Sequence, residues 1–148
     1  MPGDNKVELL QRKLSTVTVE AQERALLEII NRNDSYIVDL NTGQLFRGVD
    51  SNSSPLDPPY RSKYYAEFKL HLNPAGVVDL KLTGAFYAGF YIDSSKFPIV
   101  FNSTDEKAGI LEQKYGPTIF GLDQPSKNDL VAHLKDQIQE YYKSLLDV

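Results

Sequence analysis

The chain carries two histidines, His71 and His133, and no cysteine. The absence of cysteine excludes a thiol nucleophile, a thiolate zinc site, an iron–sulfur cluster and a disulfide scaffold. A Ser-His-Asp triad would need one of the two histidines as its base. His133 stands one position before an apolar stripe, and His71 lies in a polar stretch before a turn. We therefore expect neither histidine to be catalytic.

Carboxylates are the other side chains that support catalysis or hold a metal ion. No Asp and Asn residues are spaced as in a calcium loop, and no motif pairs two histidines. Gly84 and Gly89 lack the third glycine and the preceding buried strand of a phosphate-binding loop. We expect no metal, no cofactor and no enzyme activity. A hydrolase that used carboxylates would need a pair such as Asp79 and Asp93.

Length and charge limit the possible partners. The 148 residues are enough for one domain, so we treat 1–148 as a single unit. Sixteen Lys and Arg against twenty Asp and Glu give a net charge of -4, which disfavours nucleic-acid binding. The longest basic cluster, Arg61, Lys63 and Lys69, is interrupted by Glu67. No apolar run approaches the length of a membrane span and no signal peptide is evident, so we expect a cytoplasmic protein with no membrane contact.

The first third of the chain predicts helices followed by a hairpin. Apolar residues at helical spacing predict a helix over 18–33 with Thr18 as its cap, and 1–17 is expected to be flexible or a separate short helix. The turn-forming cluster 31–35 precedes a predicted strand, Tyr36–Leu40, whose hairpin partner would be Gln44–Val49. The segment 50–59, with three prolines and three serines, predicts an exposed loop.

The middle of the chain predicts a mixture of short elements. Aromatic residues at helical spacing predict a helix over Tyr60–Leu70. Alternating apolar residues from Val78 to Leu82 predict a half-buried strand or an extended segment that ends at Gly84. We then expect one helical turn over Ala85–Gly89 and two antiparallel strands, Phe90–Asp93 and Phe97–Asn102.

The last third predicts two helices. Ser103 and Glu106 fit a capping box for a helix that Gly116 and Pro117 would end. Ser126 is the predicted cap of a long amphipathic C-terminal helix. Together these elements predict an α+β fold, in which a small antiparallel sheet is packed by an N-terminal helix and a C-terminal helix, with one or two short helices besides.

Nine tyrosines and seven phenylalanines make the chain rich in aromatic residues. We expect Phe86 and Phe90 to lie in the core, and we leave Tyr87 and Tyr91 open between core and subunit interface. The loop 50–59, including Pro55 and Pro58, is either a second contact surface or an unstructured connector.

Four short motifs stand in a fixed order between Ile37 and Leu122, and they include the segments Thr83–Tyr87 and Ile119–Leu122. Their positions are Tyr60, Lys69, Asp79, Leu80, Thr83, Gly84, Phe86, Tyr87, Tyr115, Gly116, Phe120 and Gly121. This order resembles small structural proteins of tailed bacteriophages, of the virion-morphogenesis, tail-completion and neck (head–tail joining) class, especially their prophage-like members from Bacteroidetes. Two departures, the short segment between Lys69 and Asp79 and the alanine at position 85, argue against a DNA-facing contact.

The resemblance implies a non-enzymatic subunit of the head–tail junction or tail terminus. Its partners would be copies of itself, in a ring, and other virion proteins, and it would occur in the host cytoplasm and in the virion. We expect Tyr87, Tyr91 and the loop 50–59 to make the contacts between subunits. The alternative is an α+β module that binds a small ligand in an aromatic pocket between sheet and helices.

Overall fold

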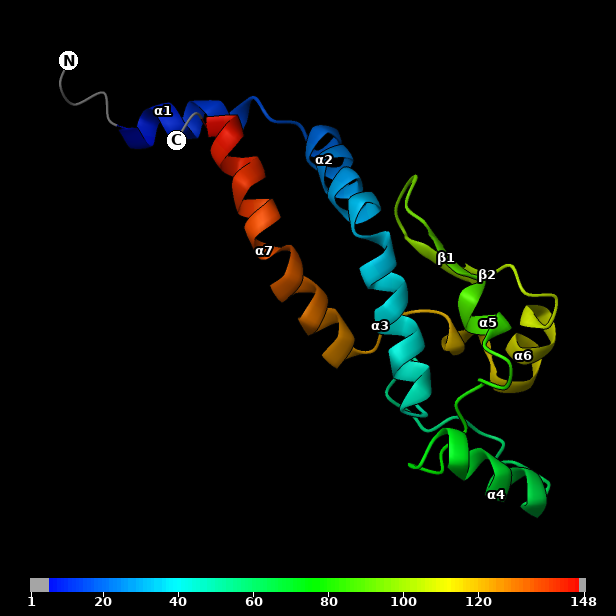
Figure 1. Cartoon of the computed structure of the whole chain (residues 1–148). Helices are drawn as coiled ribbons and strands as arrows, with labels where there is room; N and C mark the ends of the chain where they lie inside the picture. The colour runs from blue at the N-terminus through cyan, green and yellow to red at the C-terminus, as the bar shows by residue number, and fades with distance from the viewer. Residues whose placement is uncertain (1–5, 147–148) are drawn as a thin grey trace.

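The computed structural model describes residues 6–146. Over these residues the chain has an α+β fold, in which one two-stranded antiparallel sheet is combined with helices before, between and after its strands (Figure 1). The elements in chain order are α1 (Lys6–Ser15), α2 (Val19–Arg32), α3 (Asp34–Phe46), α4 (Lys63–Leu72), α5 (Ala85–Ala88), β1 (Phe90–Asp93), β2 (Val100–Ser103), α6 (Ala108–Tyr115), the 3-10 helix η1 (Pro117–Ile119) and α7 (Gln124–Leu146). The predicted fold class is therefore confirmed.

The N-terminal helices break where the sequence indicated. Helix α1 ends at Ser15 and α2 begins at Val19, after the β-branched residues that disfavour a continuous helix. Thr18 caps α2, because its Oγ1 accepts a hydrogen bond of 3.0 Å from the backbone N–H of Ala21. The segment 1–17 thus contains a separate short helix from Lys6 on, while 1–5 lies outside the described residues.

The predicted hairpin of Tyr36–Leu40 with Gln44–Val49 is wrong, because a single helix, α3, occupies Asp34–Phe46. Its buried residues are Ile37, Asn41, Gln44 and Leu45, which recur at helical spacing. Two of these four are amides, which in a sequence indicate turns rather than a core face. The helical stripe was therefore missed because half of it is polar.

The sheet is smaller than the sequence suggested. Strand β1 has its predicted bounds, whereas β2 begins at Val100 instead of Phe97; Phe90 pairs with Ser103 and Asp93 with Val100. Pro98 has no N–H to donate to a ladder, so pairing begins beyond it. The predicted strand Val78–Leu82 is not formed.

The two predicted serine caps are also wrong, because each serine is used elsewhere. Ser103 is the last residue of β2, and its hydroxyl donates to the carbonyl of Phe86 at 2.8 Å, while α6 begins only at Ala108. Ser126 lies inside α7, where its N–H donates to Oδ1 of Asp123 at 3.0 Å. By contrast with these caps, the end of α6 before Gly116 is as predicted.

The hydrogen bonds at the start of α7 also affect Asp123. Burial would raise the pKa of the Asp123 carboxyl, but hydrogen bonds from Ser126 and Ser53 bring it below its ordinary value.

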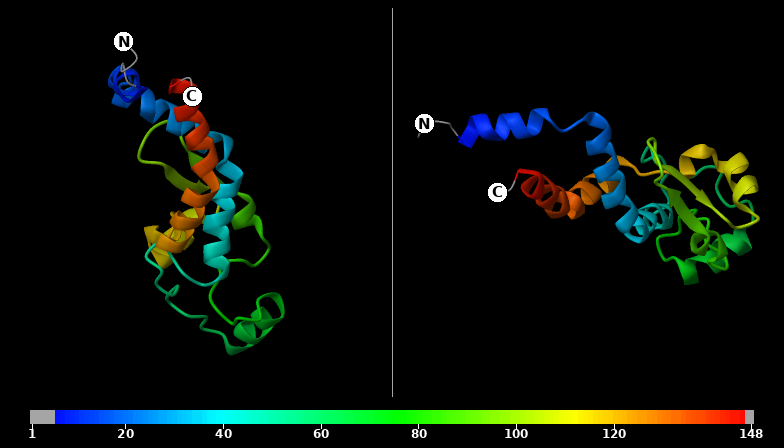
Figure 2. Two further views of the ribbon diagram at one scale, coloured as in Figure 1. Left: turned by 90° about the vertical axis from the view of Figure 1, so that its left-hand side faces the viewer. Right: turned by 90° about the horizontal axis from the view of Figure 1, so that it is seen from above.

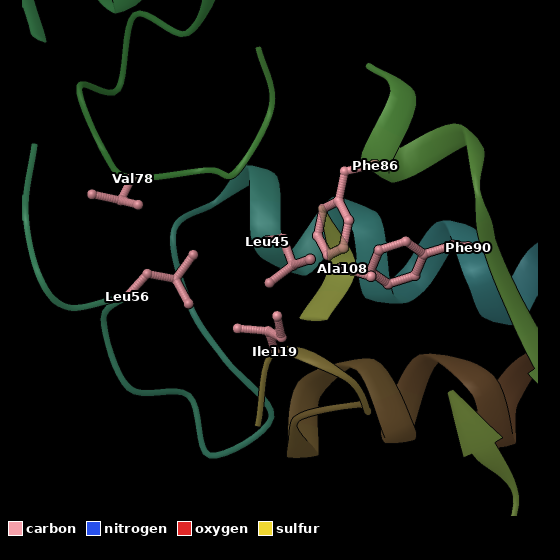
Figure 3. Close-up of a cluster of buried hydrophobic side chains, with 7 residues drawn as sticks. All are labelled: Leu45, Leu56, Val78, Phe86, Phe90, Ala108 and Ile119. Carbon is pink, nitrogen blue, oxygen red and sulfur yellow. The ribbon is translucent and has the colours of Figure 1, made fainter. Parts of the chain in front are cut away.

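Two clusters of buried side chains make the core. The first joins α3, the loop after it, α5, β1 and α6, with Phe86 and Phe90 in edge-to-face contact at 4.9 Å between ring centroids (Figure 3). Its buried members are Leu45, Leu56, Val78, Phe86, Phe90, Ala108 and Ile119. The second lies where α2, α3 and α7 meet, and Ile92 and Phe101 of the sheet pack on it. The sheet is therefore packed by helices from both ends of the chain, as predicted.

Helix α1 lies at the end of the molecule opposite α4 (Figures 1 and 2). It has no buried residue, and it contacts the C-terminal end of α7, where Nζ of Lys13 donates to the carbonyl of Leu146 at 3.2 Å. We call α1, the first half of α2 and the last part of α7 the helical arm (residues 6–26 and 138–146). The arm projects from the body that holds the sheet.

Candidate functional site

A buried ion pair lies between α4 and the irregular segment 77–84. Nζ of Lys69 is 2.7 Å from Oδ1 of Asp79, and the two side chains are 2 % and 0 % exposed. Asp79 also accepts hydrogen bonds from Nδ2 of Asn73 at 3.1 Å and from the backbone N–H of Lys81 at 2.9 Å. Lys69 in turn donates to the carbonyl of Lys81. Because both charged groups also bond to the backbone of Lys81, the pair ties the segment 79–81 to α4.

Two tyrosines complete this buried centre. The hydroxyl of Tyr60 lies 3.4 Å from Oδ1 of Asp79 and accepts from the Asp79 N–H at 3.3 Å, and the hydroxyl of Tyr87 donates to the Asp79 carbonyl. Burial, with the nearby Asp79 charge, raises the pKa of Tyr60 to about 12. Burial raises the pKa of Tyr87 further above its ordinary value. Both therefore remain neutral phenols near neutral pH and act as hydrogen-bonding groups rather than as bases.

The raised pKa of Tyr60 predicts a loss of stability at alkaline pH. Its pKa is about 12 in the folded chain against 10.0 for a free phenol, so the unfolded chain ionises first. The contribution of Tyr60 is fully present below pH 10.0 and is lost as the pH rises through about 12. We expect the free energy of unfolding, measured by urea titration, to fall over this range. Y60F should show a smaller fall, and Y91F, which alters an exposed tyrosine, should match the unsubstituted chain.

Next to the ion pair lies an open cavity of about 330 Å³. Residues 60–65, the segment 80–84 and the segment 105–115, which contains α6, form its walls, and Phe86 of α5 also reaches it. The lining residues are Tyr60, Arg61, Ser62, Tyr65, Leu80, Lys81, Leu82, Thr83, Gly84, Phe86, Asp105, Lys107, Leu111, Lys114 and Tyr115. The buried ion pair thus fixes the backbone of one cavity wall.

That wall has an unusual backbone. Leu80 has a φ of 59° and Gly84 a φ of 88°, the left-handed region that non-glycine residues rarely adopt. The hydrogen bonds that Asp79 and Lys69 make to the backbone of Lys81 hold this path in place. The alternating sequence from Val78 to Leu82 therefore does not continue as a strand.

The residues singled out by sequence largely come together here. Lys69, Asp79 and Tyr87 form the buried centre, and Tyr60 belongs both to it and to the cavity. The cavity lining also includes Leu80, Thr83, Gly84, Phe86 and Tyr115. Three lie elsewhere: Gly116 ends α6, Gly121 has a φ of 125°, and the Phe120 ring is 6.0 Å from that of Phe86. Nine lining residues were not predicted as site residues, because no local motif connects the segments 60–65, 80–84 and 105–115. They are Arg61, Ser62, Tyr65, Lys81, Leu82, Asp105, Lys107, Leu111 and Lys114.

The predicted contact residues have different environments. Tyr91 on β1 is 43 % exposed and Pro55 is exposed, while Pro58 is half-buried. Tyr87 is half-buried, and its hydroxyl donates a hydrogen bond within the chain. Only the exposed part of its ring could therefore contact a neighbouring subunit.

The loop 50–59 is not an unstructured connector. Oδ1 of Asp50 accepts from the N–H of Asn52 at 2.9 Å and from that of Ser54 at 3.0 Å, and Oδ2 accepts from the Thr118 hydroxyl at 2.8 Å. Leu56 is buried in the first core cluster. The loop is therefore exposed along most of its length but anchored to the body at Asp50 and at Leu56.

The residues considered for catalysis lie in different environments. Asp79 is fully buried on Lys69, whereas Asp93 is exposed at the end of β1, where hydrogen bonds from Ser95 lower its pKa. The two carboxylates therefore do not share an open cleft. His71 is exposed on α4, and the His133 ring stacks on that of Tyr36 at 3.7 Å.

Across residues 6–146, no group of three or more His, Asp or Glu side chains is placed to hold a metal ion. Nor does any described helix have the length and apolar composition needed to cross a membrane. Comparison with known proteins gives no matching family model, no similar curated protein and no similar solved structure.

Proposed function

We propose that this chain is a non-enzymatic assembly subunit, of the kind found at the head–tail junction or tail terminus of a tailed phage or prophage, and that it acts through contacts between subunits. Its partners would be copies of itself and other virion proteins, in the host cytoplasm and then in the virion. The observation that carries the proposal is the helical arm, which presents apolar side chains to solvent. Val7, Leu14 and Val19 are 55 %, 45 % and 66 % exposed.

Helix α1 contacts the C-terminal end of α7 but leaves much of its apolar surface exposed. Helix α1 has ten residues and buries none of them, and an isolated helix of that length is marginal in water. Between α2 and α7 lies an open groove of about 330 Å³ that is lined by Val19, Leu26, Ile29, Ile138 and Tyr141 among others. Exposed apolar surface of this kind is typical of sites that bind another protein. Both features favour assembly over catalysis as the role of the arm.

The proposal is tested first in particles. In cells that carry the gene within an inducible prophage, purified virions should contain the chain by mass spectrometry. Deletion of the gene should leave separate heads and tails, or tails of abnormal end structure, in electron micrographs. Complete and infectious particles in the absence of the chain would contradict the proposal.

The arm is tested by substitution. We expect V7D/L14D to weaken incorporation of the chain into particles at least about tenfold, since each change places a charge on apolar contact surface. The control is V131D, which makes the Val→Asp change alone at a residue of α7 that is 66 % exposed and lies outside the arm. Equal incorporation of both variants would show that the arm is not the contact surface. Circular dichroism would verify that both variants fold.

A second candidate function is a small-ligand-binding module. It is favoured by one specific observation, the aromatic-lined cavity beside the Lys69–Asp79 pair. Its volume of about 330 Å³ falls within the range of small-molecule sites. Its test is given with the ligand class below.

A further inference from the structure

The net charge of the side chains around the cavity is positive, opposite in sign to the net charge of the whole chain. Arg61, Lys81, Lys107 and Lys114 line it together with a single carboxylate, Asp105. The chain as a whole has a net charge of -4, so this concentration of cations is local. A concave site lined by one sign of charge attracts ligands of the other sign.

We infer that this cavity binds a small organic anion, about the size of a mononucleotide, which carries a carboxylate, sulfonate or phosphate group attached to an aromatic or apolar ring. The inference rests on the second candidate function, since it names the ligand class of the proposed ligand-binding module. It is independent of the assembly role of the arm, which lies at the other end of the molecule.

The cations are free to receive an anion. Within residues 6–146, none of the four lining cations forms an ion pair with a carboxylate. Two of them contact ring faces instead: Nζ of Lys81 lies 5.5 Å from the centroid of the Tyr87 ring, and Nζ of Lys114 lies 5.3 Å from that of Tyr115. Cation–π contacts of exposed lysines are weak and leave the ammonium hydrogens available. A bound anion would therefore gain charge-assisted hydrogen bonds without breaking an existing ion pair.

The remaining lining is suited to a ring. Leu80, Leu111 and Tyr115 are partly buried and pack on the first core cluster, and Phe86 is 5 % exposed. A site with apolar walls and a few convergent polar groups is the usual form of a small-molecule pocket. Inorganic phosphate alone would contact the cations but would leave these walls uncovered.

One wall is also held in advance of binding. Asp79 and Lys69 bond to the backbone of Lys81, which follows Leu80 and precedes Leu82 in the wall. A wall fixed by a buried ion pair loses little conformational entropy when a ligand enters.

The test compares two dyes of similar ring system, one anionic and one neutral: 8-anilino-1-naphthalenesulfonate and N-phenyl-1-naphthylamine. In fluorescence titrations of the full chain, we expect one site for the anionic dye and at least tenfold weaker binding of the neutral dye. Adenosine monophosphate should displace the anionic dye, and inorganic phosphate at the same concentration should not.

Charge variants assign the site to the cavity. K107Q/K114Q should weaken anionic-dye binding about tenfold and leave the neutral dye unaffected. The matched control K135Q/K143Q removes two exposed lysines of α7 and should change neither. Circular dichroism and urea midpoints confirm that each variant folds.

Each of the other possible results of these titrations would contradict one part of the proposal. Equal binding of the two dyes, or an unchanged affinity in K107Q/K114Q, would overturn the anion class while leaving the ligand-binding function standing. Displacement by phosphate alone would overturn the requirement for a ring. Failure of both dyes to bind would overturn the ligand-binding function itself.

Discussion

Replacing Asp79 by alanine is expected to lower the free energy of unfolding by about 3–5 kcal/mol, the largest effect of any single substitution considered for this chain. The variant leaves the Lys69 ammonium, 2 % exposed, without its carboxylate at 2.7 Å. It also removes the acceptor for Asn73 and for the N–H of Lys81. Urea unfolding followed by circular dichroism measures the change.

Two further variants separate the ion pair from a general effect of substitution. D136A removes an exposed carboxylate of α7 and should change the stability by no more than about 0.5 kcal/mol. K69M/D79A should be more stable than D79A alone, because methionine removes the uncompensated buried charge. A D79A variant as stable as D136A would mean that the pair is not buried in solution.

The ion pair that stabilises the fold also holds one wall of the cavity in place. Its hydrogen bonds to Lys81 fix the segment 80–84, which has left-handed backbone at Leu80 and Gly84. Such a path persists only where surrounding contacts determine it. The sequence motifs singled out Lys69, Asp79, Thr83 and Gly84. In the structure Thr83 and Gly84 line this wall, and Lys69 and Asp79 hold it through their hydrogen bonds to the backbone of Lys81.

Elements specified by local signals were predictable. The cap at Thr18, the bounds of β1 and the end of α6 before Gly116 all follow from a few adjacent residues. Elements that depend on distant partners were not. The sequence predicts Ser103 to be a helix cap, but its hydroxyl donates to the carbonyl of Phe86, which lies 17 residues earlier.

The cavity was the least predictable feature for the same reason. Its walls come from residues 60–65, 80–84 and 105–115, which no short motif connects. Arg61 belonged to a recognised basic cluster, but Lys107 and Lys114 carry no signal of their own. Only the folded chain brings them together with Arg61 and Lys81 in the lining of one cavity.

Helix α3 shows how buried amides can hide a helix. Nδ2 of Asn41 donates to the carbonyl of Ile119 at 3.1 Å, and its Oδ1 accepts from the N–H of Gly121 at 2.8 Å. Gln44 donates to the Gly121 carbonyl at 3.0 Å and accepts from the N–H of Asp123 at 2.7 Å. The two amide side chains thus supply hydrogen-bond partners to the backbone groups of an irregular segment, as a neighbouring strand would. This arrangement holds the segment before α7 against α3.

Substitution of Gln44 by alanine is therefore expected to lower the free energy of unfolding by about 2–4 kcal/mol, since it leaves two backbone groups near α7 without partners and opens a cavity at a residue with 0 % exposure. The matched control is Q139A, the same change at an exposed position of α7, with an expected effect within about 0.5 kcal/mol. Urea midpoints measure both.

Hydrogen exchange gives a local test of the same contact. The N–H of Asp123 donates to Oε1 of Gln44, so its exchange should accelerate in Q44A more than global destabilisation explains. The N–H of Ala21, bonded to Thr18 at the start of α2, serves as the internal reference. If Q44A and Q139A have the same midpoint and the same exchange at Asp123, the amide does not hold this segment, and helix α3 owes its place to its apolar residues alone.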